Sequence, residues 1–305
     1  MSQPTYDVIV IGEGVSGLTA AGALAAAGLK VATIEGQLFG GLVLNVNELD
    51  PAPGGREVSG AELASEMMGA NAEAGVTSIQ EPVTAVRREG DIVVVATDSG
   101  AHHARHVVVA SGARLRRLGV EGESEFEGRG VSQCADCDGP MYQDEDVIVV
   151  GGGDSALQES LVLAQYCRKV HLVHQGDAFS GSAHFAEQVK ANDKIAIIRN
   201  ATVDAILGSK MVEKARLKHA DGRTEELPCA GVFAYIGLEP SVGFLPAEVE
   251  RDAGGYVRTD DALQTNVAGI SAIGAARSGY AGTLVHAMDD AHRAAEVIKA
   301  RLSSR

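Results

Sequence analysis

The chain has 305 residues, of which 45% are hydrophobic and 22% are charged, enough for two domains that each bury a core. Its net charge of −15 repels phosphates and anionic lipid, which excludes nucleic acid and membranes as expected partners. No apolar run reaches the roughly 18 residues that a membrane span requires. Because residues 1–4 carry neither a basic stretch nor a cleavage site, we expect no signal peptide and a cytoplasmic location.

The chain opens with a strand, a glycine turn and a helix. Residues 6–11 are apolar and β-branched, which is typical of a buried parallel strand. Residues 12–17 follow with the pattern G-x-G-x-x-G, and we expect a helix over residues 15–27. The next strand, over residues 30–34, finishes on Glu35.

Each part of this segment suits a dinucleotide. Gly12 permits the tight turn, Gly14 lets backbone amides approach a pyrophosphate, and Gly17 lets the helix pack close to the strand. The helix N-terminus adds positive potential, and Glu35 is placed to accept hydrogen bonds from an adenosine ribose. The parts occur in the right order, so the segment predicts dinucleotide binding, for which the glycine pattern alone is weak evidence.

The rest of the first region predicts further elements of an α/β fold. Residues 39–42 and 51–55 are rich in glycine and proline, and they predict a long connection that is functional or disordered. A helix is expected over residues 60–74. Three strands then predict a β-meander. They cover residues 83–88, 92–97 and 106–110.

A second region repeats this organisation. Charged residues and glycine dominate residues 114–130, which predicts the crossing into another domain. A strand over residues 147–150 leads to a turn at Gly151 and Gly153, with Ala156 at the third glycine position. The expected elements then run in order: a helix over 155–166, a strand over 169–174, a meander over 195–218 and a closing strand over 231–237.

The chain then returns to the first region. Residues 252–274 lead to a last helix over residues 282–302. Because the two halves form an imperfect repeat, we expect an α/β protein with two Rossmann-like domains, the second inserted into the first. The first domain would cover residues 1–116 and 248–305, and the second residues 117–247.

Between the two glycine turns lies a cysteine pair, in the stretch C-A-D-C-D from Cys134 to Asp138. A C-x-x-C pair near strand–helix units is typical of a redox or metal site. A zinc site would need a second cysteine or histidine pair at ligand spacing, so we predict no metal. The pair instead suggests a disulfide that receives electrons from a flavin or a nicotinamide. Cys167 and Cys229 stand apart and are predicted to be small buried residues.

Taken together, these segments resemble the low-molecular-weight, thioredoxin-reductase-like flavoproteins across nearly the whole chain. Residues 12–17 with Glu35 resemble the FAD motif of that family, and residues 130–139 resemble its redox stretch. Residues 151–156 resemble its nicotinamide-binding turn, and residues 231–240 resemble its domain-closing strand. Each match is modest alone, but the set is highly specific for the family.

The resemblance implies an FAD-dependent dithiol–disulfide oxidoreductase. FAD would accept a hydride from NADPH and pass electrons to the disulfide Cys134–Cys137, whose dithiol would reduce a disulfide of a thioredoxin-like protein. Cys134 would attack the partner, Cys137 would lie nearer the flavin, and Asp138 would donate and accept the proton. A homodimer is also implied.

The resemblance also implies which residues hold the cofactors. For FAD they are Gly12, Gly14, Gly17, Glu35, Gly41, Ala110, Gly112 and Gly274, and Tyr280 is a further candidate from a stretch that differs from the family. For a nicotinamide they are Gly151, Gly153 and Ala156.

The nicotinamide segment departs from the family where NADPH would be recognised. NADPH-dependent members carry H-R-R-x-x-x-R after the second strand, and these arginines clamp the 2′-phosphate. Residues 174–180 read H-Q-G-D-A-F-S, without any of the arginines, and Asp177 would repel a 2′-phosphate. We therefore expect NADH or a ferredoxin-type protein as the electron donor, with NADPH third. The alternative is that residues 151–156 are retained as a packing turn without a ligand.

The flavin segment departs from the family at Ala275, where an aspartate usually holds the ribityl chain. The loss of one hydrogen bond to a ligand typically costs ~1 kcal/mol, so we expect FAD to bind through its other contacts. Two interpretations are open for Tyr280: it stacks on the isoalloxazine ring, or it is a surface tyrosine in a glycine turn.

Two rival functions stay open. The enzyme would run in reverse as a flavin-dependent dithiol oxidase that passes electrons to oxygen. Alternatively, the chain would be a non-catalytic flavin-binding sensor that uses its cysteine pair as a redox switch. For the ferredoxin donor, a local basic patch of Arg114, Arg116 and Arg117 would allow docking despite the acidic net charge.

Overall fold

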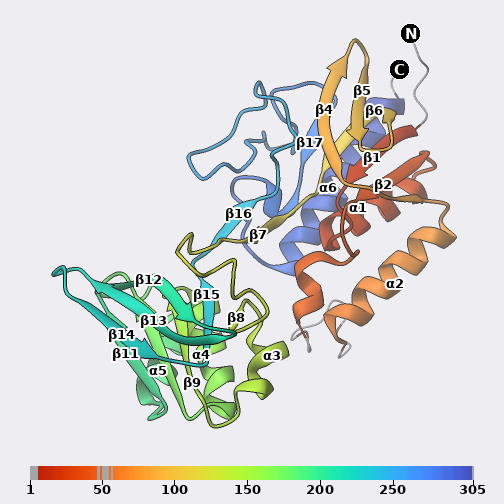
Figure 1. The fold of residues 1–305 in the computed structure, drawn as a ribbon. Coiled ribbons are helices and arrows are strands. Elements are labelled where there is room, and N and C mark those ends of the chain that lie inside the picture. The colour runs from red at the N-terminus through yellow and green to blue at the C-terminus, as the bar shows by residue number, and fades with distance from the viewer. Residues whose placement is uncertain (1–5, 47–48, 50–54, 56–57, 304–305) are drawn as a thin grey trace. The chain divides into compact units, whose positions relative to one another are not determined.

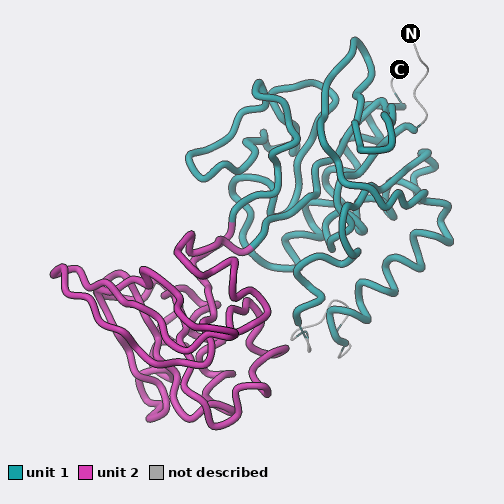
Figure 2. The backbone as a smooth tube through the Cα atoms, in the orientation of Figure 1, with its two compact units in different colours: residues 1–114, 239–305 teal, residues 115–238 magenta. Residues whose placement is uncertain are grey.

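The structure is a computed structural model and describes residues 6–46, 49, 55 and 58–303 (Figure 1). The chain forms two compact units, Met1–Arg114 with Glu239–Arg305 and Leu115–Leu238, so the second unit is inserted into the first (Figure 2). Two expectations concern residues that the structure does not describe. They are the absence of a signal peptide at residues 1–4 and the connection over residues 51–54. Where the chain is described, no helix is both long enough and apolar enough to cross a membrane.

The unit boundaries differ from the expected ones. The chain leaves the first unit after Arg114 rather than after residue 116, and it returns at Glu239 rather than at residue 248. The early return has a packing cause, because Val242 and Leu245 are buried in the core of the first unit. A short strand lies at each of the two places where the chain passes from one unit to the other, and these two strands pair with each other. They are β7 (Ala113–Leu115) and β16 (Leu238–Pro240).

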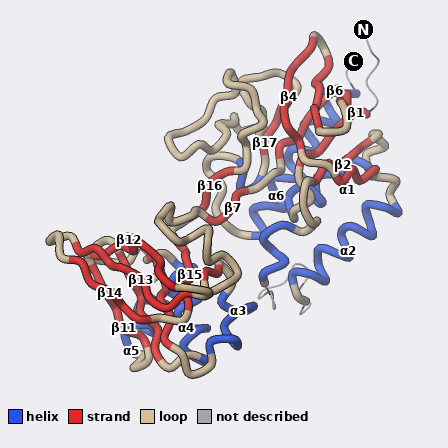
Figure 3. The backbone as a smooth tube through the Cα atoms, in the orientation of Figure 1, coloured by secondary structure: helices blue, strands red, loops and turns tan. Residues whose placement is uncertain are grey.

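A seven-stranded sheet forms the centre of the first unit (Figure 3). Its order is β3-β2-β1-β6-β5-β4, with β17 beside β6. The expected meander is present, because β4, β5 and β6 pair antiparallel, while β1, β2, β3 and β17 have parallel neighbours. The strands are β1 (Tyr6–Ile11), β2 (Val31–Glu35), β3 (Thr77–Gln80), β4 (Val83–Glu89), β5 (Ile92–Thr97), β6 (Ala101–Val109) and β17 (Ile270–Ala272).

Alternating side chains on these strands separate two apolar layers. Val8 and Val10 of β1 pack in a core with the first and last helices of the chain, and Ile9 and Ile11 lie in a second core. The alanines of the first helix allow its close approach to the sheet. The helical elements are α1 (Val15–Ala26), α2 (Gly60–Glu73), α6 (Leu284–Ser303) and the 3-10 turns η1 (Gly41–Asn45) and η4 (Gly274–Ala276).

A five-stranded parallel sheet forms the centre of the second unit, in the order β11-β10-β9-β15-β8. A three-stranded antiparallel sheet, β12-β13-β14, packs on one face through apolar residues such as Ile206 and Leu217. The parallel strands are β8 (Val131–Ser132), β9 (Asp146–Gly151), β10 (Lys169–His174), β11 (Ile195–Arg199) and β15 (Gly231–Tyr235). The antiparallel strands are β12 (Ala201–Gly208), β13 (Val212–His219) and β14 (Thr224–Pro228).

The predicted meander over residues 195–218 is therefore wrong at both ends. β11 pairs parallel with β10 and belongs to the central sheet. Asn200, with a positive φ of 53°, separates it from the antiparallel sheet that continues to Pro228. An apolar run can fill either kind of sheet, and packing of the whole unit decides between them.

Helices cover the other face of the central sheet, where Leu157 and Leu163 of α4 (Asp154–Tyr166) pack on Val149. The sequence did not predict α5 (Ala183–Ala191), whose only buried residues are Ala186 and Val189. After β8 come α3 (Ala135–Asp138) and the 3-10 turn η3 (Gly139–Tyr142). As expected, Cys167 and Cys229 are buried free thiols.

Candidate active site

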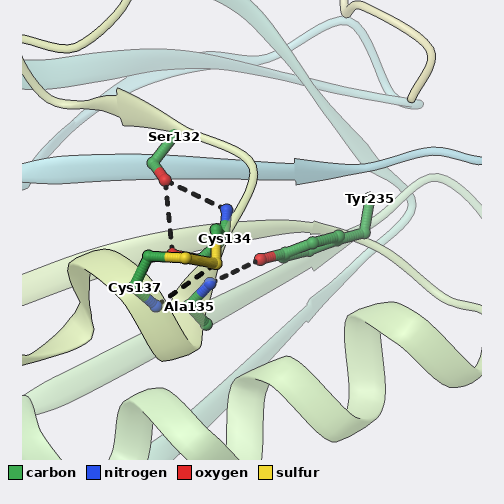
Figure 4. The surroundings of a disulfide bond; sticks show 5 residues. All are labelled: Ser132, Cys134, Ala135, Cys137 and Tyr235. Atoms are coloured by element: carbon green, nitrogen blue, oxygen red, sulfur yellow. Dashed lines mark hydrogen bonds between the residues drawn. A yellow bond between two sulfur atoms is a disulfide. The ribbon is translucent and has the colours of Figure 1, made fainter. Parts of the chain in front are cut away.

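The cysteine pair forms a disulfide at the start of α3 (Figure 4). The Cα atoms of Cys134 and Cys137 are 5.3 Å apart. Cys134 is half-buried, and Cys137 is exposed. A disulfide that is accessible in this way is open to thiol–disulfide exchange.

Backbone hydrogen bonds hold the pair in place. The hydroxyl of Ser132 accepts the N–H of Cys134 at 3.1 Å, and the Sγ of Cys134 accepts the N–H of Cys137 at 3.2 Å (Figure 4). An N–H directed at sulfur stabilises the thiolate form. After the disulfide opens, negative charge is therefore favoured on Cys134.

Two buried tyrosines lie beside α3. The hydroxyl of Tyr235 accepts the N–H of Ala135 at 3.1 Å and so ties α3 to β15 (Figure 4). Burial, and then the charge of the half-buried Asp138, raises the pKa of Tyr142. The phenol of Tyr142 consequently stays neutral next to the carboxylate.

The glycine turn of the first unit is built for close backbone approach. A Cβ at Gly12 would overlap Ala110, and a Cβ at Gly17 would overlap the backbone of Gly12. Gly41, with a φ of 63°, lies opposite Gly14, and a Cβ on it would come within 3.5 Å of the Gly14 Cα. Gly14 is the N-cap of α1, and no side chain caps that helix. The donors of the first helical turn thus fit a pyrophosphate.

Glu35 ends β2 beside this turn. Its carboxylate accepts the N–H of Glu13 at 3.0 Å and the N–H of Gln37 at 2.9 Å, and it retains acceptor capacity for a ribose. The sequence analysis missed Glu13, whose fully buried carboxylate accepts hydrogen bonds from Thr33 and Ser78. Glu13 ties the turn to β2 and β3.

The remaining expected flavin residues lie in turns of the same unit. Gly112 and Gly274 have positive φ values of 64° and 60°. Tyr280 is half-buried and stacks on His286, with ring centroids 5.5 Å apart. Its hydroxyl donates to the backbone oxygen of Thr283 at 2.8 Å. Tyr280 is therefore held by its own segment.

A buried ion pair lies next to Ala275. The guanidinium of Arg277 donates two hydrogen bonds to Asp290, at 2.6 and 2.7 Å, and the same carboxylate accepts the N–H of Gly274 at 3.0 Å. Asp290 is 1% exposed, so loss of either charge would leave a buried, uncompensated partner. This pair fixes the turn at η4, and the sequence analysis missed it because its members lie on different elements.

The glycine turn of the second unit is covered by its own chain. The backbone oxygen of Gly152 accepts the N–H groups of Ser180 and Gly181 at 2.8 and 3.0 Å. The carboxylate of Asp154 accepts the N–H of Ser182 at 2.6 Å, and a Cβ at Gly181 would come within 2.9 Å of the Asp154 nitrogen. Residues 180–182 therefore lie against the N-terminus of α4.

The expected nicotinamide residues occupy that turn. Gly151 ends β9 with a φ of 149°, Gly153 is the N-cap of α4, and Ala156 is fully buried. Where the family carries arginines, Asp177 is exposed, and its carboxylate accepts the amide of Asn200 at 2.6 Å. An exposed arginine also lies beside this segment, because the guanidinium of Arg199 is 5.7 Å from the ring centroid of Phe179.

Known proteins match this chain over nearly its full length. Residues 6–294 match the family described as pyridine nucleotide-disulphide oxidoreductase. The chain belongs to this family. The thioredoxin reductase of Treponema pallidum (strain Nichols) is 39% identical over 299 residues, which cover 96% of this chain and 97% of that protein. The thioredoxin reductase of Mycolicibacterium smegmatis is 39% identical over 276 residues, which cover 90% of this chain and 89% of that protein.

A solved thioredoxin reductase has the same fold. The thioredoxin reductase of Lactococcus lactis superposes with a TM-score of 0.92 at 30% identity, over 99% of this chain and 100% of that chain. The resemblance to thioredoxin-reductase-like flavoproteins and the fold of two Rossmann-like domains are confirmed. The chain is an enzyme, a flavin-dependent disulfide oxidoreductase that carries the disulfide Cys134–Cys137.

Among the described residues, no three His, Cys, Asp or Glu side chains lie together in a way that could hold a metal ion. Some of the described His and carboxylate side chains pair with each other. His219, for example, lies 3.0 Å from Glu225.

Proposed function

We propose that the enzyme binds FAD in its first unit and reduces a disulfide of a thioredoxin-like protein through Cys134 and Cys137. The observation that carries this proposal is the accessible disulfide in a chain whose relatives are thioredoxin reductases. FAD, when bound, takes up electrons from a donor and delivers them to the disulfide.

The chemistry at the partner is a two-step exchange. The thiolate of Cys134 attacks the partner disulfide and forms a mixed disulfide, and one partner sulfur leaves as a thiol. Cys137 then attacks the Sγ of Cys134, which restores the internal disulfide and releases the second partner thiol. The N–H of Cys137 that points at the Cys134 Sγ supports this choice of nucleophile. Asp138 exchanges the proton with the reacting sulfur.

The first glycine turn would hold the pyrophosphate of FAD, and Glu35 would hold its ribose. The open N-terminus of α1 and the tight contacts at Gly12 and Gly17 support this placement. The remaining residues that we propose for FAD are Gly14, Gly41, Ala110, Gly112, Gly274 and Tyr280.

As electron donor we propose NADH or a ferredoxin-type protein rather than NADPH. A 2′-phosphate has no arginine to bind in residues 174–180, and Asp177 would repel it. NADH would use Gly151, Gly153 and Ala156. The basic patch offered for a ferredoxin is partly neutralised, because Arg114 pairs with Glu239 and Arg117 pairs with Glu127.

An anaerobic titration of the flavin-loaded enzyme tests the donor. We expect the flavin absorbance to bleach with NADH or with a reduced ferredoxin, and slowly or not at all with NADPH. Rapid bleaching by NADPH would contradict the donor assignment. Oxygen consumption driven by a dithiol substrate would instead favour the oxidase. Failure to reduce any disulfide with chemically reduced flavin would favour the sensor.

We also propose a cytoplasmic homodimer, which the thioredoxin-reductase-like family suggests. Light scattering on the eluting protein should give about twice the mass of 31.5 kDa. The mass of a single chain would contradict the dimer.

A further inference from the structure

A carboxyl group lies under the redox helix. Glu159 belongs to α4, which packs beside α3 (Figure 1). Its Oε2 atom is buried and has no hydrogen-bond partner among the described residues. A buried carboxylate oxygen without a partner is costly when it is charged, which favours the protonated acid.

The groups that face Glu159 come from α3 and β15. On α3 they are the carboxylate of Asp136 and the N–H of Ala135, the residue that follows Cys134. On β15 it is the hydroxyl of Tyr235, which accepts that same N–H at 3.1 Å. Glu159 therefore shares its neighbours with the disulfide.

These neighbours set the protonation of Glu159. Burial, and then the charge of Asp136, raises the pKa of Glu159 from 4.5 to about 7, and the N–H of Ala135 opposes this shift. Burial, and then the charge of Glu159, raises the pKa of Tyr235, so the phenol keeps its proton. Glu159 is the group of this cluster that gains or loses a proton near neutral pH.

We propose that Glu159 takes up a proton when the Cys134–Cys137 disulfide is reduced and releases it when the disulfide re-forms. Reduction breaks the S–S bond with two electrons and, with one proton, gives a thiol and a thiolate. The new negative charge on α3 disfavours a second one on Glu159, so the carboxyl binds a further proton. Oxidation passes both electrons to the partner disulfide, which becomes a dithiol, restores the S–S bond of the pair and frees the proton of Glu159.

The consequence is a steeper pH dependence of the reduction potential of the disulfide. At pH values between the pKa of Glu159 in the oxidised enzyme and its pKa in the reduced enzyme, Glu159 binds one additional proton for each disulfide that is reduced. A dithiol releases two protons when it is oxidised and the cysteine pair takes up one, so without Glu159 the equilibrium constant for reduction rises tenfold for each pH unit. The proton that Glu159 binds offsets this rise by up to tenfold for each pH unit. Glu159 is thus a positioning residue, since it sets the charge around the reacting sulfurs.

The test is a redox equilibrium of the holoenzyme with reduced and oxidised dithiothreitol from pH 5.5 to 8.5, without oxygen. The thiols are trapped by alkylation and counted by mass. We expect the equilibrium constant of wild type to be nearly independent of pH near neutrality, where that of Glu159→Gln should rise by up to tenfold for each pH unit in favour of the reduced pair. Glu187→Gln, which removes an exposed charge on α5, should match wild type.

Identical curves for wild type and Glu159→Gln would overturn the inference. The inference rests on the proposed function only in treating the cysteine pair as redox-active. A pair that does not exchange with dithiothreitol at all would overturn that function, and the inference with it. Wild type alone gives a second test that needs no variant. Redox-difference infrared spectra at pH 7 should show a protonated carboxyl band that grows on reduction, and its absence would also overturn the proposal.

Discussion

The two units share a strand–turn–helix segment but differ at its third glycine position. In the first unit this residue is Gly17, where a Cβ would overlap the backbone of Gly12. In the second unit it is Ala156, whose methyl group is fully buried in the core. Helix α1 therefore lies closer to its turn than a methyl group permits, and α4 leaves room for one.

The surroundings of the two turns differ further. The first turn of α1 carries no acidic residue, and its N-cap, Gly14, faces Gly41. The first turn of α4 carries Asp154, and the backbone of residues 180–182 is bonded across it. Neighbouring chain is bonded to both turns, because the N–H of Gly40 donates to the backbone oxygen of Glu13 at 2.7 Å just as the N–H of Ser180 donates to that of Gly152 at 2.8 Å. The difference between the turns is therefore one of charge, since the carboxylate of Asp154 disfavours a phosphate at the N-terminus of α4.

Removal of one redox sulfur should separate the roles of the two units most strongly. In Cys137→Ser we expect disulfide turnover to fall to background, because a hydroxyl does not re-form the disulfide, while the flavin content stays at the wild-type level. Turnover with a protein disulfide and the flavin absorbance of the purified variant measure the two effects. Cys167→Ala, which alters a buried thiol outside the pair, is the control. Surviving turnover in Cys137→Ser would refute the role of the pair.

Substitution at the third glycine position of each turn should give the next largest effect, on the stability of the unit that contains it. Gly17→Ala should lower the free energy of unfolding of the first unit by about 2–4 kcal/mol and reduce flavin binding, because the methyl group meets backbone that has no room to move. The converse change, Ala156→Gly, should cost the second unit only about 1 kcal/mol. Urea denaturation followed by circular dichroism compares them. Equal losses would show that the two turns do not differ in packing.

Arginines placed at the family positions test whether the second turn still recognises a nucleotide. The triple variant Gln175→Arg, Gly176→Arg and Ser180→Arg should shift the preference toward NADPH by on the order of tenfold, because charge-assisted contacts to a 2′-phosphate are restored. The ratio of kcat/KM for NADPH and NADH measures the shift. Glutamines at the same three positions are the uncharged control. An unchanged preference would mean that this segment does not face the nucleotide.

A buried histidine should make the first unit sensitive to acid. Burial, and then the charge of Arg301, lowers the pKa of His106 from 6.5 to about 3, and its Nε2 lies 3.1 Å from the hydroxyl of Ser271. Because the unfolded chain binds the proton first, stability is complete above about pH 6.5 and declines as the pH falls toward 3. The free energy of unfolding should drop by about 1.4 kcal/mol at pH 5.5.

Urea denaturation between pH 7 and pH 5 measures this loss. His106→Gln should flatten the pH dependence by the same amount, and His103→Gln, at a half-buried position on the same strand, should leave it unchanged. A flat wild-type profile would show that His106 accepts its proton without unfolding. Acid sensitivity of the free energy of unfolding would then not distinguish the first unit from the second.

Much of the fold could be predicted from local patterns. The segment from β1 to β2 and the helices α2, α4 and α6 lie within two residues of their expected limits, because apolar periodicity and glycine ends are local signals. β3 and α5 were missed because short, largely exposed segments carry little apolar pattern. β11 was assigned to the wrong sheet because the residues of an apolar strand do not indicate which other strand it pairs with.

The same division holds for the site. The sequence identified the pair Cys134 and Cys137, which form the disulfide, and the missing arginines. It did not reveal that Tyr235 and Glu159 lie beneath the pair, nor that Arg277 and Asp290 support the turn next to Ala275. These contacts join residues that are distant in sequence, so no spacing rule finds them.

By itself the sequence determined two glycine turns, a redox pair between them and the loss of the NADPH arginines. Each of these depends on residue identity and on spacing within a few positions. Only the tertiary structure decided which distant segments lie against the two turns and what charge lies under the disulfide. The physical reason is that burial and close approach arise when whole units pack, and they set the pKa values and contacts that individual residues acquire.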